Sequence, residues 1–225
     1  MRINKYLALH KYASRREADK LIEAGRVYIN GKAATLGDQV EETDTVEVKG
    51  QLKTHRYFAY NKPRGIITHS PQGDEESIED IIPLQNVFPI GRLDKDSSGL
   101  IILTDDGRIT DGLLNPENEH EKEYEVHTLD ELPTDFKKNM ERGVDIGDYI
   151  TKPCEVQILG PRAFSITLTE GKKHQIRRMC GAFGVSAVEL RRVRILNITL
   201  GPLKEGAYRP IQGEELDGFL KEIKI

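Results

Sequence analysis

Cysteine is scarce in this sequence of 225 residues, and long apolar runs are missing. The two cysteines, Cys154 and Cys180, have neither the spacing of zinc ligands nor the pattern of a disulfide framework, so a reducing compartment is expected. The longest clean apolar run, residues 100–103, is far shorter than the roughly 20 residues of a membrane-spanning helix. The first residues also lack the apolar region of a signal peptide. We therefore expect a cytoplasmic protein without a membrane segment.

The net charge of −4 does not by itself indicate a nucleic-acid partner, but the charges are unevenly distributed along the chain. Residues 1–36 are mainly basic, whereas residues 37–48 are acidic. Clustered positive charge attracts a phosphate backbone, because neutralised phosphates release counterions. Charge alone is equally compatible with two solvated helix faces. The basic residues are Arg2, Lys5, Lys11, Arg15, Arg16, Lys20, Arg26 and Lys32 in a first group, and Lys172, Lys173, Arg177, Arg178, Arg191, Arg192 and Arg194 in a second.

Residues 1–49 have the pattern of a compact module in which two short helices precede a small sheet. Ser14 and Glu17 form the sequence signature of a capping box, so the second helix is expected to begin there. The Asn30-Gly31 pair is a strong signal for a two-residue hairpin turn between strands. The basic residues of the first group therefore lie mainly on the predicted helices.

A second, larger domain is expected from residue 57 to residue 225, after a linker at residues 50–56 that has no periodicity. Strands and helices follow one another there without strict alternation, which favours an α+β fold over a doubly wound sheet. We expect a mixed, mainly antiparallel sheet with flanking helices. The sequence predicts strands at residues 57–60, 100–104, 124–127 and 165–168, and helices at residues 134–142 and between Gly171 and Gly184.

The segment from Gly91 to Leu100 places the carboxylate of Asp94 between a glycine turn and a buried strand, where a rigid element can hold it. A plain turn-forming aspartate is the simplest alternative. The same segment also matches the ligand positions of a calcium loop that runs from Asp94 to Asp105. An EF-hand requires a helix on both sides of its loop, whereas a strand is predicted here, so the pattern disfavours calcium.

Several motifs resemble those of one enzyme family over nearly the whole chain. They are GRLD at residues 91–94 with SGL at 98–100, EKEY at 121–124, GKKHQIRRM at 171–179, and, in the front module, SRREA at 14–18 and GRVYING at 25–31. The first three are similar to motifs of pseudouridine synthases, and the last two resemble an S4-type RNA-binding domain. Together they resemble the RsuA-like family of ribosomal RNA pseudouridine synthases, most closely the large-subunit enzymes of the F-type. Enzymes of small-subunit 16S RNA are the nearest variant.

The resemblance implies that Asp94 is the essential carboxylate in a reaction that breaks the glycosidic bond and joins C5 of uracil to C1′. A carboxylate can stabilise the cationic sugar, attack C1′ or remove a sugar proton, and the sequence does not choose among these roles. Arg177 would orient and ionise Asp94 through a charge-assisted bond, with a phosphate contact as the alternative. Tyr124 would pack against the flipped uracil, with ordinary core packing as the alternative.

The resemblance also implies a pocket, a partner and no cofactor. Leu196 is expected to close the pocket beneath the base, and Arg92 either fills the gap left by the base or binds phosphate. His174 is interpreted as a hydrogen-bonding or RNA-contacting residue. The reaction is redox-neutral, so no metal, nucleotide or flavin is expected, and the sequence contains no P-loop or GxGxxG fingerprint. The expected partner of this monomer is ribosomal RNA or an assembling ribosomal subunit, bound by Arg2, Lys5, Arg15, Arg16, Lys20, Arg26, Lys172, Lys173 and Arg178.

Two other functions make different demands on the sequence. A non-catalytic RNA-binding protein with the same fold would be expected to lack Asp94, Tyr124 or Arg177, and all three are present. A hydrolase with a pair of carboxylates would need a second acid beside Asp94, and Asp96 is expected to point elsewhere.

Overall fold

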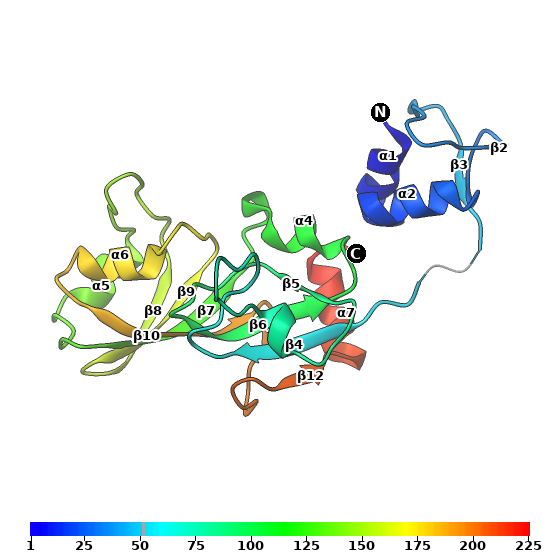
Figure 1. The fold of residues 1–225 in the computed structure, drawn as a ribbon. Coiled ribbons are helices and arrows are strands. Elements are labelled where there is room, and N and C mark those ends of the chain that lie inside the picture. The colour runs from blue at the N-terminus through cyan, green and yellow to red at the C-terminus, as the bar shows by residue number, and fades with distance from the viewer. Residues whose placement is uncertain (51–52) are drawn as a thin grey trace.

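The computed structural model describes residues 1–50 and 53–225 and shows a small N-terminal module next to a larger part built on one extended sheet (Figure 1). The expected linker at residues 50–56 includes residues 51 and 52, which lie outside the described residues. No helix within the described ranges is both long enough and apolar enough to cross a membrane.

The N-terminal module packs two short helices against a three-stranded sheet with the strand order β2-β1-β3. Ser14 caps the second helix as predicted, because its hydroxyl accepts a hydrogen bond from the Glu17 amide and the Glu17 carboxylate accepts one from the Ser14 amide. The Asn30-Gly31 turn joins β1 to β2, which confirms the predicted hairpin. The elements are α1 (Ile3–Leu9), α2 (Arg15–Glu23), β1 (Val27–Ile29), β2 (Lys32–Ala33) and β3 (Val46–Val48).

The larger part contains a nine-stranded sheet in which β12-β4-β6-β10-β7-β9-β8 follow one another, with β5 paired to β6 and β11 to β10. Only the β6–β10 pair is parallel among the strand pairs of the described residues, so the predicted α+β fold with a mainly antiparallel sheet is confirmed. The strands are β4 (Tyr57–Lys62), β5 (Phe88–Ile90), β6 (Ser98–Thr104), β7 (Lys122–Thr128), β8 (Glu155–Gly160), β9 (Ala163–Leu168), β10 (Ala187–Ile195), β11 (Ile198–Thr199) and β12 (Tyr208–Pro210).

Strand β6 is buried along its whole length, which explains its nearly continuous apolar sequence. Leu100 and Ile102 face a core cluster formed with α4 and α7, whereas Ile101 and Leu103 face a second cluster on the opposite side. The strand begins only four residues after Asp94. An EF-hand would continue into a helix at this point, so the structure excludes the calcium-loop alternative.

The helices lie at the two ends of the sheet. Helices α5 and α6 lie over the end that contains β7, β8 and β9, whereas α4 and α7 lie near β4 and β6 (Figure 1). Ile176, Met179 and Cys180 form the predicted buried stripe of α6, and Phe183 is partly buried beside them. The helices are α3 (Ile78–Ile81), α4 (Ile109–Leu114), the 3-10 helix η1 (Pro116–Asn118), α5 (Phe136–Glu141), α6 (Gln175–Gly181) and α7 (Gly213–Glu222).

Candidate active site

A cavity of about 660 Å³ opens where the loop between β5 and β6, strand β7 and the loop before α6 come together. Its polar wall contains Asp94 and His174, and its apolar wall contains Leu93, Leu168 and Leu190. The remaining lining residues are Arg92, Ser97, Tyr124, Glu170, Gly171, Lys172, Lys173, Gln175 and Ile176. The cavity therefore combines segments that are far apart in the sequence, including all three motifs of the predicted synthase domain.

Asp94 lies in a turn whose backbone is held by the fully buried Lys62. The Lys62 ammonium group donates hydrogen bonds to the carbonyl oxygens of Pro63 at 2.9 Å, Asp94 at 3.3 Å and Ser97 at 2.8 Å. Burial lowers the pKa of Lys62 to about 8, although the charges of Asp94 and Asp96 partly oppose this shift. The Asp94 side chain remains 44% exposed, so a rigid backbone presents a reachable carboxylate.

Two further contacts fix the loop on either side of Asp94. The Thr68 hydroxyl donates to the Leu93 carbonyl at 2.9 Å and accepts from the Leu93 amide at 3.0 Å. Gly99 has a φ of +106°, and a Cβ atom there would lie 2.3 Å from the carbonyl oxygen of Arg192. The glycine of the SGL motif is therefore required because β6 and β10 approach each other closely at this position.

Tyr124 lies on β7 at the boundary between two core clusters and also lines the cavity. Its ring is partly buried against both clusters, so its orientation is fixed by packing while part of it remains accessible. An aromatic side chain at such a position can support a base. Stacking on uracil stays a prediction.

The loop before α6 is shaped by a buried amide and a buried carboxylate. The Gln175 side chain donates to Glu170 at 2.8 Å and accepts from the Lys172 amide at 2.8 Å. This arrangement leaves His174 in the left-handed backbone region, with φ of 50° and ψ of 31°. Its Nδ1 atom lies 3.2 Å from Oδ2 of Asp94. Sequence reasoning gave His174 only a secondary role, because the distance between His174 and Asp94 depends on the fold.

Arg177 does not form the expected bond with the Asp94 carboxylate in the described residues. Its guanidinium donates instead to the carbonyl oxygens of Ala187 at 2.5 Å and Asp96 at 3.3 Å. Arg177 thus contacts the backbone of the turn that carries Asp94, whereas the imidazole of His174 is next to the Asp94 carboxylate. A catalytic role for Arg177 stays a prediction.

Leu196 does not line the cavity that contains Asp94, so its predicted place beneath the base is wrong. It follows β10 at the far end of that strand, where it is buried in a core cluster with Ile195 and Ile198. Leu196 instead borders a different cavity, next to Arg194. Leu190, on the same strand, occupies the apolar wall near Asp94.

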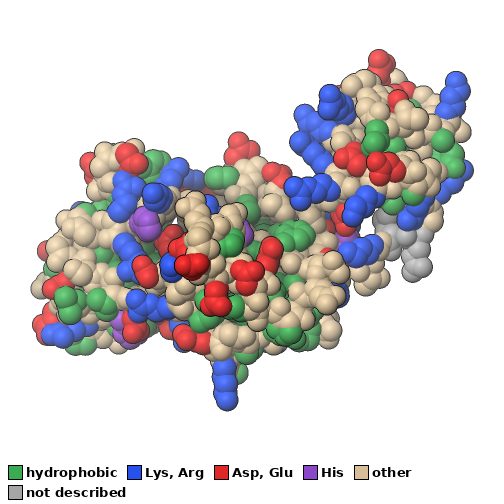
Figure 2. Space-filling model, in the orientation of Figure 1, with side chains coloured by type: hydrophobic (Ala, Val, Ile, Leu, Met, Phe, Trp, Pro, Cys, Tyr) green, Lys and Arg blue, Asp and Glu red, His purple; other side chains and the backbone are tan. Residues whose placement is uncertain are grey.

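The expected RNA-binding residues fall on separate surfaces. Exposed Arg92, Lys172 and Lys173 line the cavity with Asp94, whereas Arg178 forms an ion pair with Asp148. The space-filling view shows basic side chains over the end that carries α5 and α6 and on the N-terminal module (Figure 2). On that module, Arg15, Arg16 and Lys20 line a groove of about 970 Å³, and Lys5 lines a neighbouring groove. The Arg26 side chain donates a hydrogen bond to the Lys49 carbonyl, and Arg2 forms an isolated β-bridge with Gln39.

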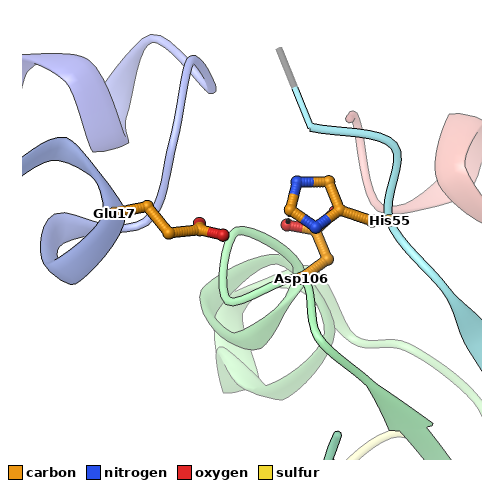
Figure 3. Close-up of side chains that lie close together, drawn as sticks. All are labelled: Glu17, His55 and Asp106. Atoms are coloured by element: carbon orange, nitrogen blue, oxygen red, sulfur yellow. Dashed lines mark ion pairs between the residues drawn. The ribbon is translucent and has the colours of Figure 1, made fainter. Parts of the chain in front are cut away.

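Glu17, His55 and Asp106 point toward one another where the N-terminal module meets the larger part (Figure 3). Three such side chains could hold a metal ion, but the carboxylates have other partners. Burial would raise the pKa of Asp106, yet hydrogen bonds from Arg108 and Tyr57 outweigh it and lower the pKa. The Glu17 carboxylate binds Ser14. Each carboxylate is thus bonded within its own part of the chain, Glu17 in the N-terminal module and Asp106 in the larger part.

The chain is also similar to known proteins. Residues 56–182 match the model of the RNA pseudouridylate synthase family, and residues 1–46 match the S4 domain. The dual-specificity RNA pseudouridine synthase RluF of Escherichia coli K12 is 43% identical over 100% of this chain and 80% of its own length. The ribosomal large subunit pseudouridine synthase B of Bacillus subtilis is 35% identical over 96% of this chain and 93% of its own length. A crystal structure of a pseudouridylate synthase superposes with a TM-score of 0.71 and 28% identity, over 99% of both chains.

Proposed function

We propose, since this chain belongs to the RNA pseudouridylate synthase family, that it isomerises a specific uridine of ribosomal RNA to pseudouridine. The large ribosomal subunit is the favoured source of this RNA, because a relative of nearly equal length is a large-subunit synthase. The observation that carries the proposal is the reachable carboxylate of Asp94, held on a rigid turn in a cavity with a tyrosine and an apolar wall.

The reaction requires no atom from outside the RNA apart from exchangeable protons. The N1–C1′ bond breaks, the uracil turns, a C5–C1′ bond forms, C5 loses a proton and N1 gains one. The Asp94 carboxylate is placed to stabilise the cationic sugar, to attack C1′ or to remove a sugar proton. In each case the carboxylate acts in its ionised form. The isomerisation as a whole is redox-neutral, so the proposed mechanism includes no redox cofactor.

Access to C1′ requires that the uridine leave its stack, because a paired and stacked nucleotide presents neither its sugar nor its base edge to a carboxylate. The cavity of about 660 Å³ has room for a flipped nucleoside. We assign its apolar wall and Tyr124 to the base, and the exposed Arg92, Lys172 and Lys173 to the adjoining phosphates.

The N-terminal module provides a second RNA-binding surface in this proposal. Its helix α2 carries Arg15, Arg16 and Lys20 along one groove. We propose residues 1–49 as the S4 domain, residues 50–56 as the linker and residues 57–225 as the catalytic domain. The partner is ribosomal RNA or an assembling ribosomal subunit, and the place of action is the cytoplasm, since the relatives are bacterial enzymes of RNA.

Pseudouridine mapping in ribosomal RNA from cells with and without this gene tests the proposal. Loss of the gene should remove at least one pseudouridine, and the wild-type gene should restore it. Asp94→Asn should fold normally but restore nothing, because an amide cannot replace an ionised carboxylate in any of the three roles.

Asp96→Asn is the matched control, since Asp96 is exposed and lies in the same turn. It should restore the modification. An active Asp94→Asn variant would show that another group performs the chemistry, and an unchanged pseudouridine map without the gene would refute the ribosomal substrate.

A further inference from the structure

The contact between His174 and Asp94 joins two partly exposed side chains across the candidate active site. The two side chains are 47% and 44% exposed, and their Nδ1 and Oδ2 atoms are 3.2 Å apart. Exposed pairs usually contribute little to stability, because both side chains are free to move. A pair of this kind is informative only if the protein fixes the positions of both partners.

The backbone of His174 is fixed by buried groups on its own loop. Gln175 is 4% exposed and bridges the Glu170 carboxylate and the Lys172 amide, so the loop closes on itself. Glu170 is held in turn by the Tyr149 hydroxyl at 2.7 Å. His174 itself adopts a left-handed conformation that few non-glycine residues adopt, although histidine and asparagine are enriched there.

Asp94 is fixed from the other side of the cavity. Lys62 holds its carbonyl from below, and Arg177 holds the carbonyl of Asp96 in the same turn. These contacts restrain the backbone but leave the carboxylate free to rotate. Among the described residues, only His174 pairs with that carboxylate, and it does so through Oδ2 alone.

We propose that His174 is the positioning residue of Asp94: its Nδ1–H holds Oδ2 and thereby presents Oδ1 to the sugar of the flipped uridine. The donor is available in both the imidazolium and the neutral Nδ1–H form, so the contact does not require a particular charge on the ring. This inference rests on the proposed function, because it assigns a role only if Asp94 is the reacting carboxylate.

The surroundings of His174 favour a contact with Asp94 over an ion pair elsewhere. The charged groups that line the cavity with it are Asp94 and Arg92 from the opposite loop and Glu170, Lys172 and Lys173 from its own loop. Glu170 is already bonded to Tyr149, Lys152 and Gln175. Of the two acids that line this cavity, Asp94 is therefore the one whose carboxylate pairs with the imidazole of His174.

Three substitutions of His174 separate positioning from a structural role. His174→Asn keeps a donor at the place of Nδ1 and tolerates the left-handed backbone. His174→Gly suits that backbone at least as well but removes the donor. His174→Gln carries its amide one atom farther out, in the place of Nε2. If the donor positions Asp94, the asparagine variant should retain activity and the other two should not.

The measurement is the single-turnover rate of pseudouridine formation in a large-subunit ribosomal RNA transcript, together with the Kd of the same transcript. His174→Gly and His174→Gln should lower the rate on the order of 100-fold, as expected when a reacting group is misplaced by about 1 Å, with Kd changed less than about threefold. His174→Asn should stay within about tenfold of the wild type. Thermal unfolding should be unchanged for all three variants.

Three results would overturn this role for His174. A fully active His174→Gly variant would show that the donor is dispensable. A weaker Kd with an unchanged rate would make His174 an RNA contact instead. Equal losses in the asparagine and glycine variants would exclude a role for a donor at the Nδ1 position. An inactive wild type, or an active Asp94→Asn, would instead refute the proposed function itself, so the two failures are distinguishable.

Discussion

Three buried or largely buried basic side chains carry positive charge that no carboxylate within bonding distance balances. Lys62 and Arg192 are buried, Lys122 is largely so, and their bonded partners are carbonyl oxygens. Burial lowers the pKa of both lysines to about 8, and the charge of Arg192 contributes in each case. A buried charge without a carboxylate partner costs free energy, so a compensating benefit is expected. For Lys62 that benefit is the rigid turn that presents Asp94.

Lys62→Met should therefore have two separable effects. The methionine cannot donate to the three carbonyls of the turn, so the rate of modification should fall at least tenfold. The pH dependence of the unfolding free energy should also change. In the wild type the folded state releases the Lys62 proton near pH 8, whereas the unfolded chain keeps it to about pH 10.5, so this group makes unfolding free energy rise with pH in that window. The variant should lose this contribution.

Urea unfolding at several pH values between 8 and 9.5 gives the slope of the unfolding free energy against pH. Near the upper end of this range, the slopes of wild type and variant should differ by the equivalent of about one proton. Both proteins share the other titrating groups, so the contributions of those groups to the slope cancel in the comparison. Lys122→Met is the matched control, because Lys122 has a similar pKa but donates to the His120 carbonyl outside the turn. Its slope should change likewise while the modification rate stays normal. Identical rates for both variants would refute the role of Lys62.

Whole elements show what the sequence could and could not predict. The strand predicted at residues 100–104 appears as Ser98–Thr104, because burial on both faces demands a continuous apolar run. The capping box at Ser14 was predictable because its hydrogen bonds are local.

Contacts between distant elements were not predictable in this way. No local sequence pattern indicates that β10 pairs with β6. Nor does one indicate that the side chain next to the Asp94 carboxylate is His174 and not Arg177. Leu196 and Leu190 are equally apolar residues in or next to one strand, and only the sheet order shows which of them faces the cavity.

The pairing of β6 with β10 depends on Gly99, which offers a test at the level of elements. Gly99→Ala combines a strained φ of +106° with a Cβ atom 2.3 Å from the Arg192 carbonyl oxygen and 2.6 Å from its amide nitrogen. Backbone atoms of a central strand cannot move aside easily. We expect a loss of about 3 kcal/mol or more in unfolding free energy, or insoluble protein.

Chemical denaturation measures this loss, with Gly160→Ala as the control. Gly160 lies at the end of β8, has no positive φ, and an added Cβ atom there meets nothing within 4 Å. The control should remain within about 0.5 kcal/mol of the wild type. Equal stability of both variants would mean that β6 and β10 do not approach as closely as described.

At the scale of the whole molecule, the N-terminal module contacts the larger part at the turn between β6 and α4. Arg108 donates to the Lys11 carbonyl at 3.3 Å, and Gly107 faces Ser14, the cap of α2. The same turn binds the segment before β4, since Asp105 pairs with Lys53 and Arg56. The groove of about 970 Å³ beside this contact is lined from both parts of the chain, so its shape depends on the contact.

Gly107→Val should break this contact without unfolding either part. A Cβ atom at Gly107 would lie 2.8 Å from Cβ of Ser14, and a branched side chain needs the space that Ser14 occupies. Gly107 has no positive φ, so valine causes no backbone strain there. The module should separate, which raises the radius of gyration in small-angle scattering. RNA should bind several-fold more weakly, because the basic residues of α2 no longer line a groove with Lys53 and Arg56.

Gly160→Val is the control for the valine itself, and it should leave both measurements unchanged. The rate of modification at saturating RNA should also be retained in Gly107→Val, because the cavity with Asp94 contains no residue of the N-terminal module. Separation of affinity from rate in this one variant would assign binding to the paired modules and chemistry to the larger part alone. A wild-type radius of gyration together with wild-type affinity would show that the described contact does not hold the two parts together in solution.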